Sequence, residues 1–200
     1  ASADGRMDGK AAYPGGFANR ERDKSRIRVM IVDDSLVART VLSRIVLAEA
    51  DIEVSQHEPV FASVGLKFIL VEVKNLEALG KAASQLDPLT ALRATFADED
   101  CDCATFLYTW VGADHVRARM FAPFDNVAED PATGSASAAL GAFLTTLGSA
   151  LPERHLLIEQ GAEMGRRSLI RLRVTTNDGK FDQVEISGNS VLITRGELYL

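Results

Sequence analysis

The sequence predicts an α+β fold in which a mixed, mostly antiparallel sheet wraps around one central helix. Three observations indicate it: short apolar runs follow one another after about residue 60, tight-turn residues separate several of them, and the one strong helix among them is poor in long side chains. Short strands that do not alternate regularly with helices favour antiparallel pairing. A short β-α-β segment is expected before this part of the chain.

Charge and composition limit the classes of partner. The 200 residues include 22 basic and 28 acidic side chains, which gives a net charge of −6. Nucleic acids and anionic membrane surfaces attract basic proteins, so neither is expected as a partner. No apolar run approaches the roughly 18 residues that a membrane-spanning helix needs, and two cysteines cannot build a disulfide framework. We expect a soluble, cytoplasmic, globular protein.

Three regions follow one another along the chain. Residues 1–26 are rich in glycine, alanine and charge, and we expect them to form a flexible tail. Residues 27–59 are expected to form the β-α-β segment, with a strand at Ile27–Val32 and a helix over Leu36–Ala50, where apolar residues recur at helical spacing. Residues 60–200 are expected to form the main domain.

The main domain contains a series of expected elements. A strand is predicted over Val64–Val73, a loose helical stretch over Leu76–Leu92, and a hairpin of the strands Thr105–Val111 and Val116–Ala122. Four more strands are expected near the C-terminus: Leu156–Gln160, Ser168–Thr176, Val184–Ser187 and Ser190–Ile193. The residues Asn177–Gly179 supply a tight turn between two of them.

The clearest motif is Glu129–Ser135, which leads directly into the strong helix. Either Asp130 caps this helix, with Pro131 at its first position, or Thr133 caps it. Both alternatives place unpaired backbone N–H groups and the positive end of the helix dipole beside a carboxylate and hydroxyls. Such a helix start can bind a carboxylate or a phosphate without a lysine.

The helix that follows the motif has almost no bulk in its first two turns, where glycine, serine and alanine predominate. A helix without long polar side chains has no solvent face, so we expect closely approaching strands to enclose it. The alternative is an alanine-rich surface helix with a well-formed cap. The absence of lysine and glutamate between Asp130 and Leu147 disfavours that alternative.

The segment EDPATGSASAALGAFL resembles the signature of the phenazine-biosynthesis PhzF-like family, whose members are relatives of diaminopimelate epimerase. Further stretches agree with the family in order: Ser63–Phe68, Val116–Pro123, Glu159–Arg166 and Ile186–Val191. The resemblance implies two similar domains, each wrapping a mixed sheet around a central helix, with the active site between them. It also implies cofactor-free acid/base chemistry, such as isomerisation or epimerisation, on a small carboxylate-bearing metabolite.

The resemblance also assigns roles to individual residues. Asp130 matches the family's motif acid near the substrate and is the candidate catalytic residue, with a helix cap as its alternative role. Gly134 and Ser135 match the helix-start groups that hold the substrate carboxylate, and Thr133 lies beside them as a further candidate binding residue. Gly161 would lie on the loop facing them. Three more matching residues are expected to serve loop structure: Gln160, Glu163 and Arg166.

The N-terminal region departs from the family. The resemblance implies a first domain with a catalytic glutamate and a histidine-bearing segment, and residues 1–59 contain nothing like it. We therefore expect weak or no turnover by a lone monomer. A second copy of the chain, or a separately encoded N-terminal domain, could complete the cleft. Homodimerisation would bury the apolar surface of an unpaired half-cleft.

A different resemblance concerns the start of the β-α-β segment. Arg28–Ser35 and the following helix resemble the opening of a CheB-type response-regulator receiver domain, in which paired acids bind Mg²⁺ beside a phosphorylatable aspartate. The match ends near Val54, without the acceptor aspartate or the lysine. Asp33 and Asp34 are therefore interpreted as a helix cap and a vestigial pair, and as weak metal candidates only. Cys101–Cys103 is interpreted as a loop, because no second pair or nearby histidine completes a metal site.

The leading hypothesis is a PhzF-like isomerase or epimerase that needs no cofactor or metal. One alternative is a phosphorelay module whose receiver-like start docks a kinase or another partner. The other is a domain that binds a small acid without catalysis. The three make different predictions for proton exchange, aspartyl phosphorylation and ligand binding.

Overall fold

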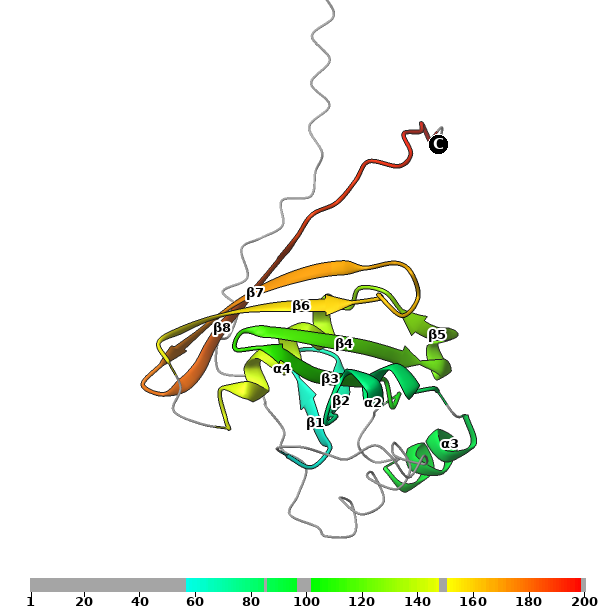
Figure 1. Cartoon of the computed structure of the whole chain (residues 1–200), viewed down its shortest axis with the longest axis horizontal. Coiled ribbons are helices and arrows are strands. Elements are labelled where there is room, and N and C mark those ends of the chain that lie inside the picture. Colours follow the sequence, from blue (N-terminus) through cyan, green and yellow to red (C-terminus); the bar gives the residue numbers. More distant parts are fainter. Residues whose placement is uncertain (1–56, 85, 97–101, 148–150, 199–200) are drawn as a thin grey trace, which may run out of the picture.

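The main feature of the fold is a mixed eight-stranded sheet (Figure 1). The computed structural model of the chain describes residues 57–84, 86–96, 102–147 and 151–198. The strands are β1 (Val60–Ser63), β2 (Lys67–Glu72), β3 (Thr105–Gly112), β4 (His115–Ala122), β5 (Val127–Asp130), β6 (Glu153–Gln160), β7 (Ser168–Asn177) and β8 (Lys180–Gly188). The helices are α2 (Leu76–Lys81), α3 (Leu86–Thr95) and α4 (Gly134–Leu144), with a short 3-10 turn, η3, at Pro123–Asp125.

The strands pair in the order β1-β2-β3-β4-β6-β7-β8, and β5 pairs with β4 beside this path. Pairing is parallel between β2 and β3 and between β4 and β6, and antiparallel in every other pair. The two parallel pairs arise where a helical connection returns the chain to the same end of the sheet. The sheet is therefore mixed and mostly antiparallel, as the sequence predicts.

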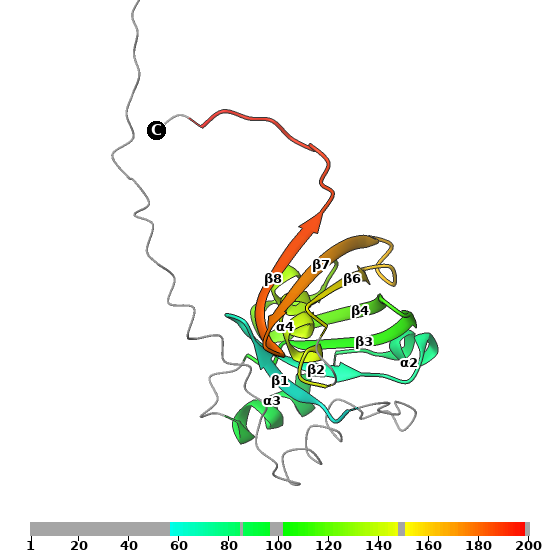
Figure 2. The same cartoon turned by 90° about the vertical axis from the view of Figure 1, so that its left-hand side faces the viewer.

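The helix α4 packs against the concave face of this sheet, which curves around it (Figure 2). Residues 136–143 of α4 are all buried, and they share one core with apolar residues of β2, β3, β4, β6 and β7. Small residues allow the close approach. A Cβ atom at Gly141 would lie only 3.0 Å from Val174 Cγ2 on β7.

The opposite face of the sheet is covered by α2 and α3, whose apolar residues form a second core. Ile69 and Val71 of β2 point into this core, together with Leu79 of α2 and Leu92 of α3. The helical stretch expected over Leu76–Leu92 is thus two short helices, which complete the burial of the other sheet face. The break between them precedes Pro88, which the first turn of a helix accommodates.

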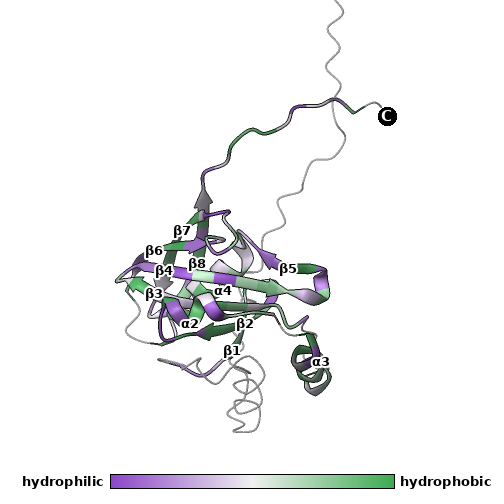
Figure 3. Cartoon of the chain, turned by 45° about the vertical axis from the view of Figure 1, so that its right-hand side comes forward, coloured by the Kyte–Doolittle hydropathy of each residue, from purple (hydrophilic) through white to green (hydrophobic). Residues whose placement is uncertain are grey.

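Two expected strands differ from the observed ones. The expected strand Val64–Val73 begins only at Lys67, because Val64 and Gly65 form the turn of the β1–β2 hairpin. The predicted strand Ser190–Ile193 is wrong: residues 189–198 leave the sheet after β8 without regular structure (Figure 2). Several of these residues are apolar and exposed, including Val191, Leu192 and Ile193, and the ribbon of this segment carries hydrophobic colour in Figure 3. Alternating apolar residues indicate a strand only where a neighbouring strand is present to pair with them.

Several expectations fall on residues outside the described ranges. They include the tail 1–26, nearly all of the β-α-β segment, and the pair Asp33 and Asp34. Among the residues that are described, no three or more His, Cys, Asp or Glu side chains gather in a way that could hold a metal ion. No helix in the described part of the chain is both long and apolar enough to cross a membrane.

Candidate active site

The motif acid Asp130 ends β5, where the sheet meets the start of α4. It pairs with Met120 on β4, and β4 in turn pairs in parallel with β6, so that Ala118 faces Gln160. β3 occupies one edge of β4, so β5 and β6 pair one after the other with its opposite edge, which brings Asp130 and Gln160 together although 30 residues separate them in sequence. Both residues are hydrogen-bonded to Thr133, the N-cap residue of α4.

The carboxylate of Asp130 is held by its own loop. The hydroxyl of Thr133 donates to Asp130 Oδ2 at 2.6 Å, and the amide of Ala132 is a longer donor to Oδ1, at 3.4 Å. The Asp130 side chain is only partly buried. One carboxylate oxygen is thus firmly hydrogen-bonded, while the other retains most of its capacity to accept hydrogen bonds.

The side chain of Gln160 connects this loop to the sheet. Its Oε1 accepts a hydrogen bond from the Thr133 amide at 3.0 Å. Its Nε2 donates to Thr133 Oγ1 at 2.9 Å and to the backbone oxygen of Asp130 at 2.6 Å. Gln160 is fully buried, and Thr133 is only 7% exposed. Every polar atom of this amide is therefore satisfied without water.

The first turn of α4 presents free backbone donors. Thr133 is the N-cap residue, but its side chain makes no capping bond: its Oγ1 accepts from Gln160 Nε2 and donates to Asp130 Oδ2. Within the described ranges, no protein acceptor contacts the amide N–H groups of Gly134, Ser135 or Ala136. Gly134 and Ser135 are partly exposed, whereas Ala136 is fully buried. Unpaired amides at the positive end of a helix dipole form a suitable environment for a carboxylate or phosphate.

Gly161 packs directly against the Asp130 loop. Its φ of +74° lies in the left-handed region. A Cβ atom there would lie 2.9 Å from Pro131 Cα and 2.5 Å from the backbone oxygen of Arg166. Only glycine satisfies both the backbone conformation and the space, so this residue fixes the distance between the β6–β7 loop and the Asp130 loop.

Arg119, on the neighbouring strand β4, anchors β5 just before the Asp130 loop. Its guanidinium makes two 2.8 Å bonds to the Glu129 carboxylate and also donates to the α2 carbonyl of Leu79. The bonds to Glu129 raise the pKa of Arg119. The sequence did not single out this pair, since arginine and glutamate on neighbouring strands carry no distinctive motif.

A further ionic cluster lies beside Gln160. Glu159 accepts a hydrogen bond from Arg167 at 2.5 Å and another from Arg117 at 3.1 Å, and His115 lies 3.3 Å away. The bond from Arg167, together with the charge of Arg117, lowers the pKa of Glu159. Because Glu159 and Gln160 are successive residues on a strand, their side chains point to opposite faces. The cluster therefore supports the outer face of β6 and leaves the inner face to Gln160.

The structure brings the sequence-predicted residues together. Asp130, Thr133, Gly134 and Ser135 form one continuous loop and helix start, and Gly161 packs against it. The Thr133 hydroxyl, however, is engaged with Asp130 and Gln160 rather than open to a ligand. Gln160 supports the loop, as expected, but sequence alone did not indicate that its amide contacts Asp130 and Thr133.

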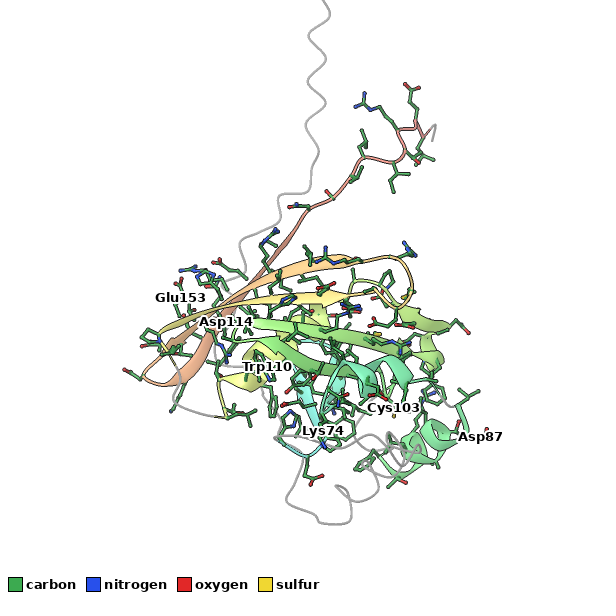
Figure 4. All side chains as sticks on the ribbon, in the orientation of Figure 1. Lys74, Asp87, Cys103, Trp110, Asp114 and Glu153 are labelled. Atoms are coloured by element: carbon green, nitrogen blue, oxygen red, sulfur yellow. The ribbon has the colours of Figure 1, made fainter. Side chains whose placement is uncertain are left out.

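A separate cavity lies at the C-terminal end of α4, and it is not part of this site. Leu144, Thr145 and Arg154 are among its lining residues, together with Asp114. Trp110 and Asp114 lie at the end of the sheet remote from β5 (Figure 4). No sequence-predicted site residue lines this cavity.

A comparison with family sequence models identifies the chain. The phenazine biosynthesis-like protein family (PhzC-PhzF) matches residues 27–196. The chain belongs to this family. The PhzF-like resemblance inferred from the motif Glu129–Ser135 is thereby confirmed. The match begins at residue 27, so it includes the segment that resembles a receiver domain, and that second resemblance stays a prediction.

Curated relatives agree with this membership. An uncharacterised isomerase from Mesorhizobium japonicum is 35% identical over 158 residues, which cover 77% of this chain and 52% of the relative. A trans-2,3-dihydro-3-hydroxyanthranilate isomerase from Pseudomonas chlororaphis is 34% identical over 137 residues, covering 68% of this chain and 46% of that protein. The chain thus spans about half the length of the curated relatives that it matches.

Solved structures support the fold. A PhzF-family phenazine biosynthesis protein from Bacillus anthracis superposes with a TM-score of 0.57 at 22% identity, covering 78% of this chain and 55% of that one. A predicted epimerase from Pseudomonas aeruginosa gives a TM-score of 0.53 at 26% identity, covering 83% of this chain and 55% of that one. The mixed sheet with few helices is accordingly a PhzF-like arrangement.

Proposed function

We propose that this chain is an isomerase or epimerase that moves a proton on a small carboxylate-bearing metabolite. The observation that carries the proposal is the juxtaposition of Asp130 with the free amides of Gly134 and Ser135. The amides would hold the substrate carboxylate, and Asp130 Oδ1 would accept or return the proton beside it. The names of the curated relatives, which are isomerases, support the same reaction class.

The proposed reaction uses only side-chain and backbone groups. Removing a proton next to a carboxylate requires a base and a stabilised negative charge, which Asp130 and the amides of α4 would supply. We therefore expect activity to survive desalting and treatment with a metal chelator. Loss of activity on such treatment, with recovery on adding back a metal or cofactor, would contradict this part of the proposal.

The 200-residue chain is expected to act weakly by itself and to need a partner surface. Ile186, which lies beside Gly134, is 45% exposed, and Val191 and Ile193 in the following segment are 83% and 91% exposed. The outer edge of β8 has no partner strand in the described part of the chain. Association with a second copy, or with a separate N-terminal domain, would bury this apolar surface and close the site.

Deuterium wash-in tests the proposal. The chain is incubated in D₂O with small carboxylate-bearing metabolites, including trans-2,3-dihydro-3-hydroxyanthranilate, and incorporation is followed by mass spectrometry. The Asp130→Ala variant should lose incorporation. The matched control is Asp114→Ala, which removes an exposed carboxylate at the remote end of the sheet and should retain it.

The dependence on protein concentration separates the two kinds of partner. If the rate of deuterium incorporation rises more steeply than the protein concentration, and analytical ultracentrifugation shows a dimer, a homodimer is supported. A rate that rises only when an N-terminal domain is added supports a complementing domain. No incorporation above the Asp130→Ala level under either condition would refute catalysis. Thermal stabilisation by a carboxylate without exchange would then indicate a small-acid binding domain.

A further inference from the structure

We propose that Gln160 is a positioning residue, which sets the direction of the Thr133 hydroxyl and thereby presents Asp130 Oδ1 to the substrate. This inference rests on the proposed function, since it gives a role to an atom of the proposed catalytic acid. It concerns how that acid is oriented, and it can be measured in the free protein.

The orientation of the Gln160 amide follows from its neighbours. The Thr133 N–H can only donate, so it must face Gln160 Oε1, 3.0 Å away. The backbone oxygen of Asp130 can only accept, so it must face Nε2, 2.6 Å away. The reverse orientation would place two donors together and two acceptors together. The two backbone groups therefore fix which end of the amide carries the donors.

The amide then fixes the hydroxyl. Gln160 Nε2 donates its second hydrogen to Thr133 Oγ1 at 2.9 Å. Because Gln160 already donates to Oγ1, the one hydrogen of the hydroxyl is left for Asp130 Oδ2, at 2.6 Å. This produces a directed chain of hydrogen bonds from Gln160 through Thr133 to Asp130, with each proton in a defined place.

The chain of hydrogen bonds distinguishes the two carboxylate oxygens. Oδ2 is bound to the hydroxyl, whereas Oδ1 has only the 3.4 Å contact with the Ala132 amide. Burial decreases along the same path: Gln160 is fully buried, Thr133 is 7% exposed, and Asp130 is partly buried at the opening. Water cannot replace the inner bonds, so the protein alone determines that Oδ1 is the oxygen available for proton transfer.

Two variants of Thr133 separate positioning from support of the loop. Gln160 also holds the loop through its two backbone bonds, and Thr133→Val leaves both intact while it removes the hydroxyl. Thr133→Ser retains the hydroxyl. The matched control is Thr145→Val, which removes a hydroxyl bonded to the Ala142 carbonyl at the other end of α4. Gln160→Glu removes the amide donor itself.

The first experiment needs no substrate. Three-bond NMR couplings report the side-chain rotamer of Asp130 in the isotopically labelled 200-residue chain. We expect one rotamer in the wild type, in Thr133→Ser and in Thr145→Val, and rotamer averaging in Thr133→Val and Gln160→Glu. A single unchanged Asp130 rotamer in Thr133→Val would overturn the proposal, whatever the catalytic result.

The second experiment uses a metabolite that shows deuterium incorporation. Misplacing a catalytic group by about 1 Å costs on the order of 100-fold in rate, so Thr133→Val should lower kcat by about 100-fold. KM should stay within about twofold, because the amides of α4 are untouched, and Thr133→Ser should recover most of kcat. A rise in KM at constant kcat would overturn the proposal. Absence of exchange in the wild type would refute the proposed function, while the rotamer measurement would still decide the role of Gln160.

Discussion

Gly161→Ala is the substitution that tests the geometry of the site most sharply. The new methyl group would lie 2.5 Å from the Arg166 backbone oxygen and 2.9 Å from both Cα and Cβ of Pro131. These neighbours are backbone and ring atoms, which cannot move away as the end of a flexible side chain can. The Asp130 loop must therefore shift, or the β6–β7 loop must open.

Two physical costs contribute to the expected destabilisation. A residue with a Cβ atom at φ of +74° is strained by about 1–2 kcal/mol, part of which is offset because alanine loses less backbone entropy on folding than glycine. Forcing a methyl group into occupied space adds about 1–3 kcal/mol. We expect the free energy of unfolding to fall by about 2–4 kcal/mol in total.

Gly165→Ala is a matched control in the same loop. Gly165 has a similar φ, +68°, but no atom lies within 4 Å of the position that its Cβ would occupy. It should therefore show only the conformational cost, about 1 kcal/mol. Urea unfolding of both variants measures the difference. Equal losses of stability in the two variants would show that Gly161 does not pack on Pro131 as described and would refute the reasoning.

Three further predictions concern the elements around the site. Arg119→Met should lower the free energy of unfolding by about 3–5 kcal/mol, because it leaves Glu129 unpaired in a half-buried position; a loss below 1 kcal/mol in urea unfolding would contradict this. Folding lowers the pKa of Glu159 below its usual value of 4.5, so its ionised form adds stability above that pH, and this contribution is lost as the pH falls below it. In Glu159→Gln the free energy of unfolding should therefore fall less as the pH is lowered through this range. The same dependence on pH as in the wild type would argue against the Arg167 contact. Gly141→Leu should prevent α4 from packing on β7 and abolish cooperative thermal unfolding, whereas a sharp transition near the wild-type temperature would contradict the buried position of this helix.

The sequence was most informative where local pattern and tertiary environment agree. In β3 and β4, apolar residues either alternate with polar ones or follow one another directly, and this pattern predicts the hairpin. The small side chains of α4 likewise predict that this helix is buried. The turn at Asn177–Gly179 was also predictable, since Asp178 and Gly179 both adopt positive φ values. The prediction that the helix start binds an anion rests on the same local chemistry and stays a prediction.

The remaining features depend on contacts that sequence spacing does not encode. The strand β5 is short and polar, and it forms because β4 lies beside it. The first residues of β6 are Glu153 and Arg154, which are in a strand because β7 pairs with them. The bonds between Gln160 and the Asp130 loop arise because β5 and β6 pair with the same edge of β4, which is a consequence of topology and not of a sequence motif. Residues 190–193 show the converse case, with a strand-like pattern and no partner.

The most direct test of the account is an NMR titration of the 200-residue chain with a small carboxylate such as benzoate. If the start of α4 holds a carboxylate, the amide resonances of Gly134, Ser135 and Ala136 should shift together and saturably, and the resonances of Thr145 and Thr146 at the other end of the helix should not. Shifts confined to other parts of the protein, or no saturable shift at Gly134–Ala136, would contradict the central claim.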